Sequence, residues 1–323
     1  MGPALVAFLM LVWASPAPAE EARSLNGFTI ERHTVPREKI LPGGPQRDGI
    51  KSVDEPVFVS AEEASWVAPD TPVIGVAIGD QARAYPVHLI EYHQIVNDEI
   101  GGTPVAVTYD PLSGTPIAYR RTLDDRVLTF GVSGLIYKAN FLLYDRETES
   151  LWSQFRGQAL SGPLSGRSLT RVPTRQEPMG AWLQRHPKTV VLTRPEPRKI
   201  DYRYSPFRAY WVSENVPFPL DDTDARYHPK EVALGIEVGG KARAYLGSIL
   251  TAAGGRIVDD FEGHRIRVAY DAEASAFLWE APDDVVVTDA YWFAWKNFYP
   301  GTEIWRDMNP SVRQPSPSPQ QSP

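Results

Sequence analysis

Hydrophobic and polar residues alternate in two separate stretches of the chain, 74–85 (IGVAIGDQARAY) and 234–245 (LGIEVGGKARAY). Alternation with a period of two residues is typical of half-buried β-strands. Each stretch has a pair of turn residues at its centre, Gly79-Asp80 in the first and Gly239-Gly240 in the second. The pattern therefore predicts two β-hairpins, each closed by a tight turn.

Apolar runs and prolines predict the elements that follow each hairpin. The apolar segment 87–96 predicts a helix in the first stretch. A second hairpin is then expected in both, with its first strand ending at Tyr109 or at Tyr270. Further on, a short tryptophan-bearing helix is expected to end at a proline, Pro187 or Pro300.

The two stretches belong to a longer internal repeat. Residues 95–110 match residues 257–271 with a one-residue gap, and residues 181–189 match residues 294–302 in the positions of their Trp, Pro and Thr. Matches that recur in the same order are the signature of a repeated unit. We therefore predict an α+β, β-rich fold made of two diverged copies of an antiparallel-sheet module with short helices.

The sequence pattern divides the chain into segments of different character. An apolar run from Ala4 to Ala14 and a small-residue cleavage site before Glu20 predict a secretory signal. The apolar run is shorter than the roughly 20 residues that cross a bilayer, so we expect a periplasmic or secreted protein without stable membrane insertion after cleavage. The predicted segments are a signal peptide (1–19), an N-terminal extension (20–47), copy 1 with the site (48–200), a linker (201–231), copy 2 as scaffold (232–308) and a disordered tail (309–323).

Composition narrows the class of protein. The chain has 323 residues, of which 42% are hydrophobic, and is therefore long enough to bury a core. A formal net charge of -7 argues against a nucleic-acid partner, because binding to phosphates requires a basic face. The chain contains no cysteine, which excludes disulfides, thiolate nucleophiles and thiolate metal ligands.

Polar residues distinguish the two copies. Copy 1 has His93 and Asn97 where the repeat alignment gives copy 2 Ala253 and Asp259, and copy 1 alone contains a long insertion, 130–166. A requirement of the fold would apply to both copies. We therefore expect copy 1 to carry the functional site and copy 2 to serve mainly as scaffold.

The candidate site lies around His93 and the turn DPLSGT at 110–115. An Asp-x-x-Ser turn beside a histidine can hold an activated hydroxyl or a hard metal ion, with His93 and Asp110 as the candidate metal ligands. Arg146 can clamp a carboxylate or a phosphate. Structural roles are the alternative: a packed histidine, an Asp that caps its own turn, a solvated hairpin tip and buried aromatic residues. The ligand-binding candidates are His93, Asn97, Asp110, Ser113, Thr115, Asp145, Arg146 and Trp152.

Three long segments resemble one known family. They are YPVHLIEYHQIVNDEIGGTPVAVTYDPLSGTPIAY (85–119), FGVSGLIYKANFLLYDRETESLWSQFRGQAL (130–160) and DYRYSPFRAY (201–210). Together they resemble the family of domain of unknown function 3179, which contains exported or lipoprotein-type proteins of bacteria and archaea. The resemblance extends from about Asp48 to Leu250.

The resemblance implies a site chemistry from which this chain departs. Family members usually have cysteines at the positions of Asp110 and Ser113, a glutamate at that of Gln94 and a methionine at that of Leu143. Two thiols, a histidine and a thioether would suit Cu(I) or a redox dithiol. Without these soft donors the chain is expected to bind copper weakly or not at all, and the sequence assigns it no cofactor.

Three functions remain open from the sequence. The first is an exported binding protein whose copy-1 pocket, around His93, Asp110, Ser113 and Arg146, holds a small anionic ligand or a metal ion. The second is a periplasmic enzyme in which His93 acts as a base with Ser113 or Asp110. The third is a degenerate family member that serves as a structural or partner-binding domain.

Overall fold

The computed structural model describes residues 24–195 and 200–306. The predicted signal peptide and the predicted tail lie outside the described residues. The predicted β-rich α+β character is confirmed, and the five larger sheets have a propeller-like arrangement. In the part of the chain that is described, no helix is long and apolar enough to span a membrane.

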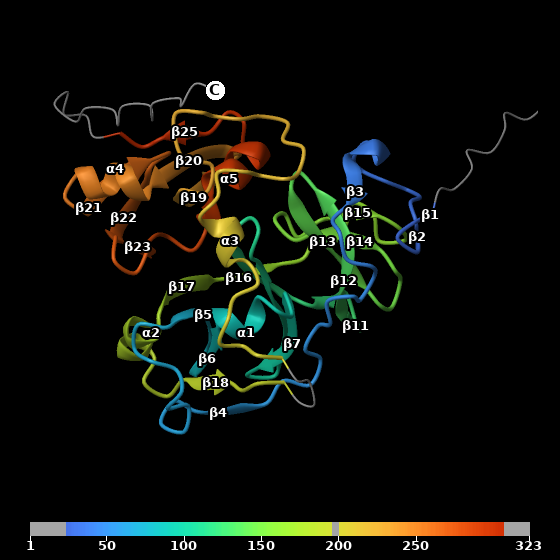
Figure 1. The fold of residues 1–323 in the computed structure, drawn as a ribbon, viewed down its shortest axis with the longest axis horizontal. Coiled ribbons are helices and arrows are strands. Elements are labelled where there is room, and N and C mark those ends of the chain that lie inside the picture. Colours follow the sequence, from blue (N-terminus) through green and yellow to red (C-terminus); the bar gives the residue numbers. More distant parts are fainter. Residues whose placement is uncertain (1–23, 196–199, 307–323) are drawn as a thin grey trace, which may run out of the picture.

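Two sheets form the first half of the molecule (Figure 1). The larger sheet has the strand order β17-β5-β6-β18-β4, with bounds Thr174–Pro178, Pro72–Ile78, Gln81–Pro86, Val190–Leu192 and Phe58–Ser60. The smaller sheet has the order β16-β9-β8-β7, with bounds Arg171–Val172, Thr115–Arg120, Thr103–Asp110 and Ile95–Ile100. Helix α1 (Val87–Ile90) connects β6 to β7, and helix α2 (Met179–Arg185) follows β17.

Two further sheets form the second half, which lies above the first in Figure 1. One has the order β24-β19-β20-β25, with bounds Val286–Tyr291, Val232–Val238, Lys241–Leu246 and Glu303–Ile304. The other has the order β21-β22-β23, with bounds Arg256–Phe261, His264–Asp271 and Ala276–Glu280. Helix α4 (Gly247–Ala252) follows β20, and helix α5 (Trp292–Phe298) follows β24.

The predicted insertion forms four strands of a fifth sheet, to which the N-terminal extension adds strand β3. Its order is β15-β14-β13-β12-β3, with bounds Ala159–Ser161, Leu151–Ser153, Asn140–Asp145, Phe130–Tyr137 and Ile40–Pro42. The remaining strands form two small hairpins, β1 (Ser24–Leu25) with β2 (Phe28–Thr29) and β10 (Thr122–Leu123) with β11 (Arg126–Val127). The remaining helices are η1 (Arg37–Lys39) and α3 (Arg208–Trp211). The insertion sheet packs on one face of β7–β9, where Ile95 and Ile117 meet Phe130, Leu143 and Trp152.

The two halves share a strand order and a packing device. The order β17-β5-β6-β18 parallels β24-β19-β20-β25, and β7-β8-β9 parallels β21-β22-β23. In each half a tryptophan ring lies against a glycine of the first hairpin. A Cβ added to Gly75 would lie 2.3 Å from Trp182, and one added to Gly235 would lie 2.2 Å from Trp295. Both glycines are therefore required by the close approach of an aromatic ring.

Each half contains a tyrosine–aspartate hydrogen bond at the same place, and this pair of bonds shows which residues of the two halves correspond. The Tyr85 hydroxyl donates to Asp98 over 2.6 Å, and the Tyr245 hydroxyl donates to Asp259 over 2.8 Å. β7 and β21 have six residues each, and β8 and β22 have eight each, so the two hairpins align without a gap. Asp98, and not Asn97, is therefore the counterpart of Asp259, which corrects the alignment made from the sequence.

The helix predicted over 87–96 is shorter than expected. Helix α1 ends at Ile90, and β7 begins at Ile95. Between them Gln94 has a φ of 60°, in the left-handed region, through which a right-handed helix cannot continue. The Gln94 carbonyl accepts a hydrogen bond of 2.8 Å from the Tyr109 N–H. The backbone of Gln94 is therefore hydrogen-bonded to the neighbouring strand β8. The helices α2 and α5 end before their prolines, as predicted.

Candidate functional site

A buried polar network lies beneath the turn at 110–115. Asp110, at the end of β8, is 1% exposed. Its Oδ1 accepts a hydrogen bond of 3.0 Å from the Leu112 N–H, and its Oδ2 accepts bonds from Asn140 Nδ2 (2.9 Å) and the Phe141 N–H (3.2 Å). The first of these bonds makes Asp110 the cap of its own turn. The other two join the turn to strand β13 of the insertion sheet.

The hydroxyl groups of the same turn complete this network. Ser113 Oγ and Thr115 Oγ1 are 2.8 Å apart, and Thr115 Oγ1 donates to Gln154 Oε1 over 2.9 Å. Asn140 Nδ2 also donates to Ser113 Oγ (3.1 Å) and to Gln154 Oε1 (2.8 Å). The structure therefore joins Asp110, Ser113 and Thr115, three residues of one turn, in a single network.

Asn140 and Gln154 were missed in the sequence analysis. Both are fully buried members of the insertion sheet region, and Asn140 Oδ1 accepts from the Phe155 N–H over 3.1 Å. The available signal was a polar amide residue next to large apolar residues in two segments of the insertion, NFLLY and LWSQF. Buried amides of this kind are expected to have hydrogen-bond partners, because an unpaired one is costly.

A small cavity lies beside the network. It has a volume of about 170 Å³, and its polar lining side chains are Gln94 and Asp110. The rest of the lining is glycine backbone, proline and apolar side chains, including Leu112, Val132 and Phe141. Gln94 is 5% exposed, and its side-chain amide has no hydrogen-bond partner among the described residues.

Gln94 is therefore unusual in two ways. Its backbone has a left-handed conformation that costs a non-glycine residue on the order of 1–3 kcal/mol. Its side-chain amide has no protein partner among the described residues, yet it is not one of the fully enclosed unpaired groups, so it faces accessible space. Residues with a strained backbone cluster at ligand sites, where selection for function can maintain a conformation that lowers the stability of the fold.

Burial raises the pKa of two acidic residues in this part of the molecule, Asp110 and Glu91. Burial raises the pKa of Asp110, and hydrogen bonds from Ser113 and from the N–H groups of Leu112 and Phe141 partly oppose this effect. Burial also raises the pKa of Glu91, to about 7, against a lowering effect of Ser205. Ser205 Oγ donates to Glu91 Oε2 over 3.0 Å, whereas Glu91 Oε1 has no partner among the described residues.

The segment 202–218 covers the turn and the cavity. The Tyr210 hydroxyl donates to the Leu112 carbonyl over 2.7 Å, and Trp211 Nε1 donates to the Pro111 carbonyl over 3.1 Å. Phe207 and Phe218 supply part of the apolar lining. The predicted linker is thus one wall of the site.

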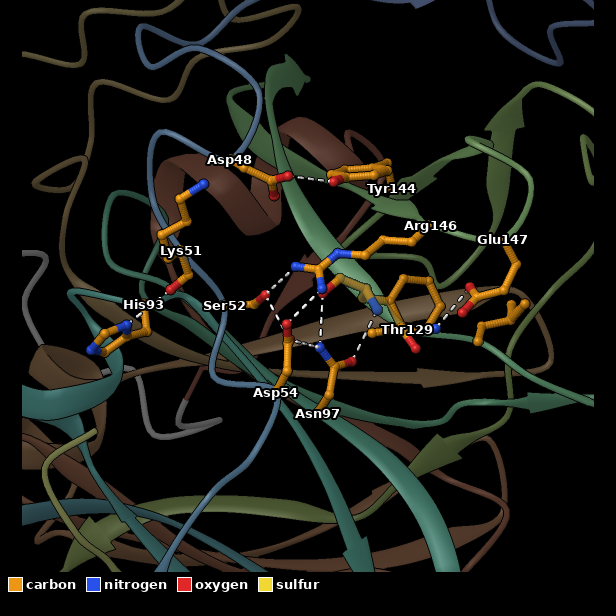
Figure 2. Close-up of polar contacts among 12 residues, drawn as sticks. Asp48, Lys51, Ser52, Asp54, His93, Asn97, Thr129, Tyr144, Arg146 and Glu147 are labelled. Carbon is orange, nitrogen blue, oxygen red and sulfur yellow. Dashed lines mark hydrogen bonds and ion pairs between the residues drawn. The ribbon is translucent and has the colours of Figure 1, made fainter. Parts of the chain in front are cut away.

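His93 contacts a different part of the chain. It is 1% exposed, and its Nδ1 lies 2.9 Å from the Lys51 carbonyl (Figure 2). A carbonyl can only accept, so Nδ1 carries the proton in this contact. Nε2 can then accept from the Tyr202 hydroxyl, 2.7 Å away. His93 therefore links two segments far apart in the sequence.

Asn97 and Arg146 also hold the segment 48–54 (Figure 2). Asn97 Nδ2 donates to Asp54 Oδ1 and to the Phe130 carbonyl, each over 2.8 Å, and Asn97 Oδ1 accepts from the Phe130 N–H over 3.0 Å. Arg146 Nη1 donates to Asp54 Oδ2 over 2.5 Å, and Nη2 to Ser52 Oγ over 2.9 Å. The charged groups of Arg146 therefore engage the chain itself.

Asp145 and Trp152 form the hairpin tip that carries Arg146. Asp145 accepts hydrogen bonds from the Thr148 N–H (2.6 Å) and from Trp152 Nε1 (2.8 Å), and both residues are 0% exposed. Within the described residues, no group of three or more His, Cys, Asp or Glu side chains is placed to hold a metal ion. The eight predicted residues thus divide into the network at the turn and the contacts around segment 48–54.

The fold defines a β-rich protein of two similarly ordered halves, with a small and mostly apolar cavity beside the turn at 110–115. The family described as "Protein of unknown function (DUF3179)" matches residues 47–282, so the chain belongs to this family, and the resemblance expected from the sequence is confirmed. No curated protein and no solved structure matches the chain.

Proposed function

We propose that this chain binds a small, mostly apolar molecule that carries a hydrogen-bond donor, in the cavity between Gln94 and Asp110. One observation carries the proposal: Gln94 is almost fully buried, lines the cavity and has no hydrogen-bond partner among the described residues. A ligand in the cavity would give this amide the hydrogen-bond partner that the protein does not supply.

The size and lining of the cavity define the ligand. Its volume of about 170 Å³ lies below the range of roughly 300–1,000 Å³ typical of sites for drug-sized molecules. An apolar cavity of about 150 Å³ is known to hold benzene. The aromatic side chains of Phe141, Phe207 and Phe218 suit a ring of that size.

Asp110 decides the polarity of the ligand. A carboxylate accepts hydrogen bonds and repels an anion, and Asp110 lines the cavity. An amine or a hydroxyl group is therefore favoured over an acid. The small anionic ligand and the metal ion expected from the sequence are not favoured in this cavity.

The enzyme hypothesis finds less support than binding. Ser113 Oγ is engaged by Thr115 and Asn140, and both ring nitrogens of His93 are engaged by Lys51 and Tyr202. The acidic side chain hydrogen-bonded to Ser113 is Asp110, and it also accepts from the Leu112 and Phe141 N–H groups and from Asn140, as expected of a group that caps its turn. We also infer that the two halves are diverged copies of one module and that the first copy retains the site. Because residues 1–19 have the pattern of a secretory signal, we further infer that the chain acts outside the cytoplasm.

Calorimetric titration with matched probes tests the proposal. Benzylamine and benzyl alcohol should bind more tightly than toluene, which has the same ring without a donor. The substitution Gln94→Leu should weaken benzyl alcohol by about tenfold or more, since it removes a buried hydrogen bond of 1–3 kcal/mol or so. Gln94→Asn, which keeps the amide on a shorter side chain, should give an intermediate affinity.

The control is the same substitution at an exposed glutamine, Gln184→Leu on α2, which should leave all affinities unchanged. Thermal melting of each variant verifies folding. Equal affinities for toluene and benzyl alcohol would contradict the proposal, as would benzyl alcohol binding that Gln94→Leu leaves intact.

A further inference from the structure

A second and larger hollow lies between the two halves. It is a cleft of about 540 Å³ between the β21–β23 sheet and the segment of β17 and α2. Figure 1 shows β23 beside β17, and the two strands are in contact. The cleft lies apart from the cavity at Gln94, because the two share no lining residue.

One face of the β21–β23 sheet forms the floor of this cleft. Strand pairing forms one row across the sheet from Val258, Arg267 and Glu280. It forms a second row from Arg256, Ala269 and Leu278. Residues that pair across strands in this way share a face of the sheet. The face therefore combines an apolar centre with arginines at its margin.

The corresponding face of the first half is covered. There, β7–β9 present Ile95, Ala106 and Ile117 to the insertion sheet, which buries them. The register set by Asp98 and Asp259 makes Arg256 the counterpart of Ile95. The second half has no insertion, and its face carries charge instead of a buried apolar layer.

Four arginines line the cleft: Arg175, Arg185, Arg256 and Arg267. Arg185 is paired with Glu177, and Arg267 with Glu280. Among the described residues, Arg175 and Arg256 form no ion pair within 4.0 Å. Positive charge therefore exceeds negative charge in the cleft, although the chain as a whole has a formal charge of -7.

Arg175 holds its charge in a partly buried position. Its guanidinium carbon lies 3.9 Å from the centre of the Trp279 ring, and its Nη1 donates to the Trp279 carbonyl over 2.8 Å. Burial lowers the pKa of Arg175 and the nearby Arg185 lowers it further, whereas the acidic groups of Glu177, Asp289 and Glu280 raise it. Two like charges at the edge of an apolar floor are an arrangement that a bound anion would relieve.

We propose that this cleft is a second binding site, for a small anion that carries an apolar body, such as an aryl phosphate or an aryl carboxylate. The anionic group would lie among the arginines, and the apolar body would lie on Val258, Ala269 and Leu278. The volume of the cleft is within the roughly 300–1,000 Å³ typical of small-molecule sites.

Titration calorimetry with phenyl phosphate tests this proposal. The double variant Arg256→Gln/Arg267→Gln should weaken phenyl phosphate by about tenfold or more, because charge-assisted hydrogen bonds are lost. Inorganic phosphate, which lacks the ring, and benzyl alcohol, which lacks the charge, should each bind this cleft more weakly than phenyl phosphate. Both arginines are exposed, so the double variant should melt at the temperature of the parent protein.

Arg265→Gln is the matched control. Arg265 lies two residues from Arg267 on β22 and is exposed, but it does not line the cleft, so its removal should leave the affinity unchanged. Gln94→Leu should also leave it unchanged, which separates this proposal from that of the cavity.

Three outcomes would overturn the proposal: no binding of phenyl phosphate, equal loss in Arg265→Gln and the double variant, or equal affinity for inorganic phosphate. Self-association that the double variant abolishes would assign the face to a second copy of the chain and would also overturn it.

Discussion

Glu91 is held in surroundings that favour its neutral form. The residue is 1% exposed, its carboxyl receives one hydrogen bond, from Ser205, and burial raises its pKa to about 7. An exposed glutamate has a pKa of about 4.3. Between these values the folded protein retains a proton that the unfolded chain has lost.

The sign of the resulting pH dependence follows from linkage. Glu91 contributes stability that is present below about pH 4 and is lost as the pH rises to about 7, at up to about 1.4 kcal/mol per pH unit. Glu91→Gln keeps an acceptor for Ser205 and cannot ionise. Urea unfolding from pH 4 to 8 should show the variant gaining stability over the parent protein as the pH rises to about 7.

The exposed Glu62→Gln serves as the control, with no such trend expected. A stability difference between Glu91→Gln and the parent protein that stays constant with pH would refute this account of Glu91.

At the scale of elements, segment 48–54 is held by two side chains, Asn97 and Arg146. Both were selected in the sequence analysis as ligand-binding candidates. Asn97 reproduces the bonding of a neighbouring strand, since it accepts from the Phe130 N–H and donates to the Phe130 carbonyl. It therefore links β7 to β12, which belong to different sheets. Arg146 reaches the same segment from an exposed hairpin tip.

These two residues should differ in their effect on stability. Asn97→Val leaves buried main-chain groups of Phe130 without partners and should cost about 2–4 kcal/mol. Arg146→Gln breaks a partly exposed ion pair and should cost less than about 1 kcal/mol. Urea unfolding measures both. A larger cost for Arg146→Gln, or lost benzyl alcohol binding with it, would mean that Arg146 acts in the site and not in holding the segment.

The sequence could predict the hairpins because alternation and Gly turns are local signals. It could also place Asp110, Ser113 and Thr115 together, since they share one turn. It could not separate ligand groups from structural ones, because His93, Asn97 and Arg146 carry the same chemistry in either role. Gln94 stood out only as a departure from the family pattern, and its left-handed backbone could not be read from the sequence.

At the scale of the whole molecule, the two halves differ in what covers one sheet face. The insertion buries this face in the first half and, through Asn140 and Gln154, fixes the turn beside the cavity. The second half leaves the equivalent face open, with arginines around it. The cavity and the cleft both depend on segments distant in sequence, such as 202–218 or β17, which no local pattern could have connected.

The central claim is that the Gln94 amide is the polar group that receives the ligand. The most direct measurement is the NMR signal of this side-chain amide, identified as the glutamine signal that is missing from Gln94→Leu. Saturating benzyl alcohol should shift it, while the signal of Gln154, whose Nε2 already donates to Thr108 and Thr115, should stay in place. A Gln94 signal that does not move under saturation would contradict the account.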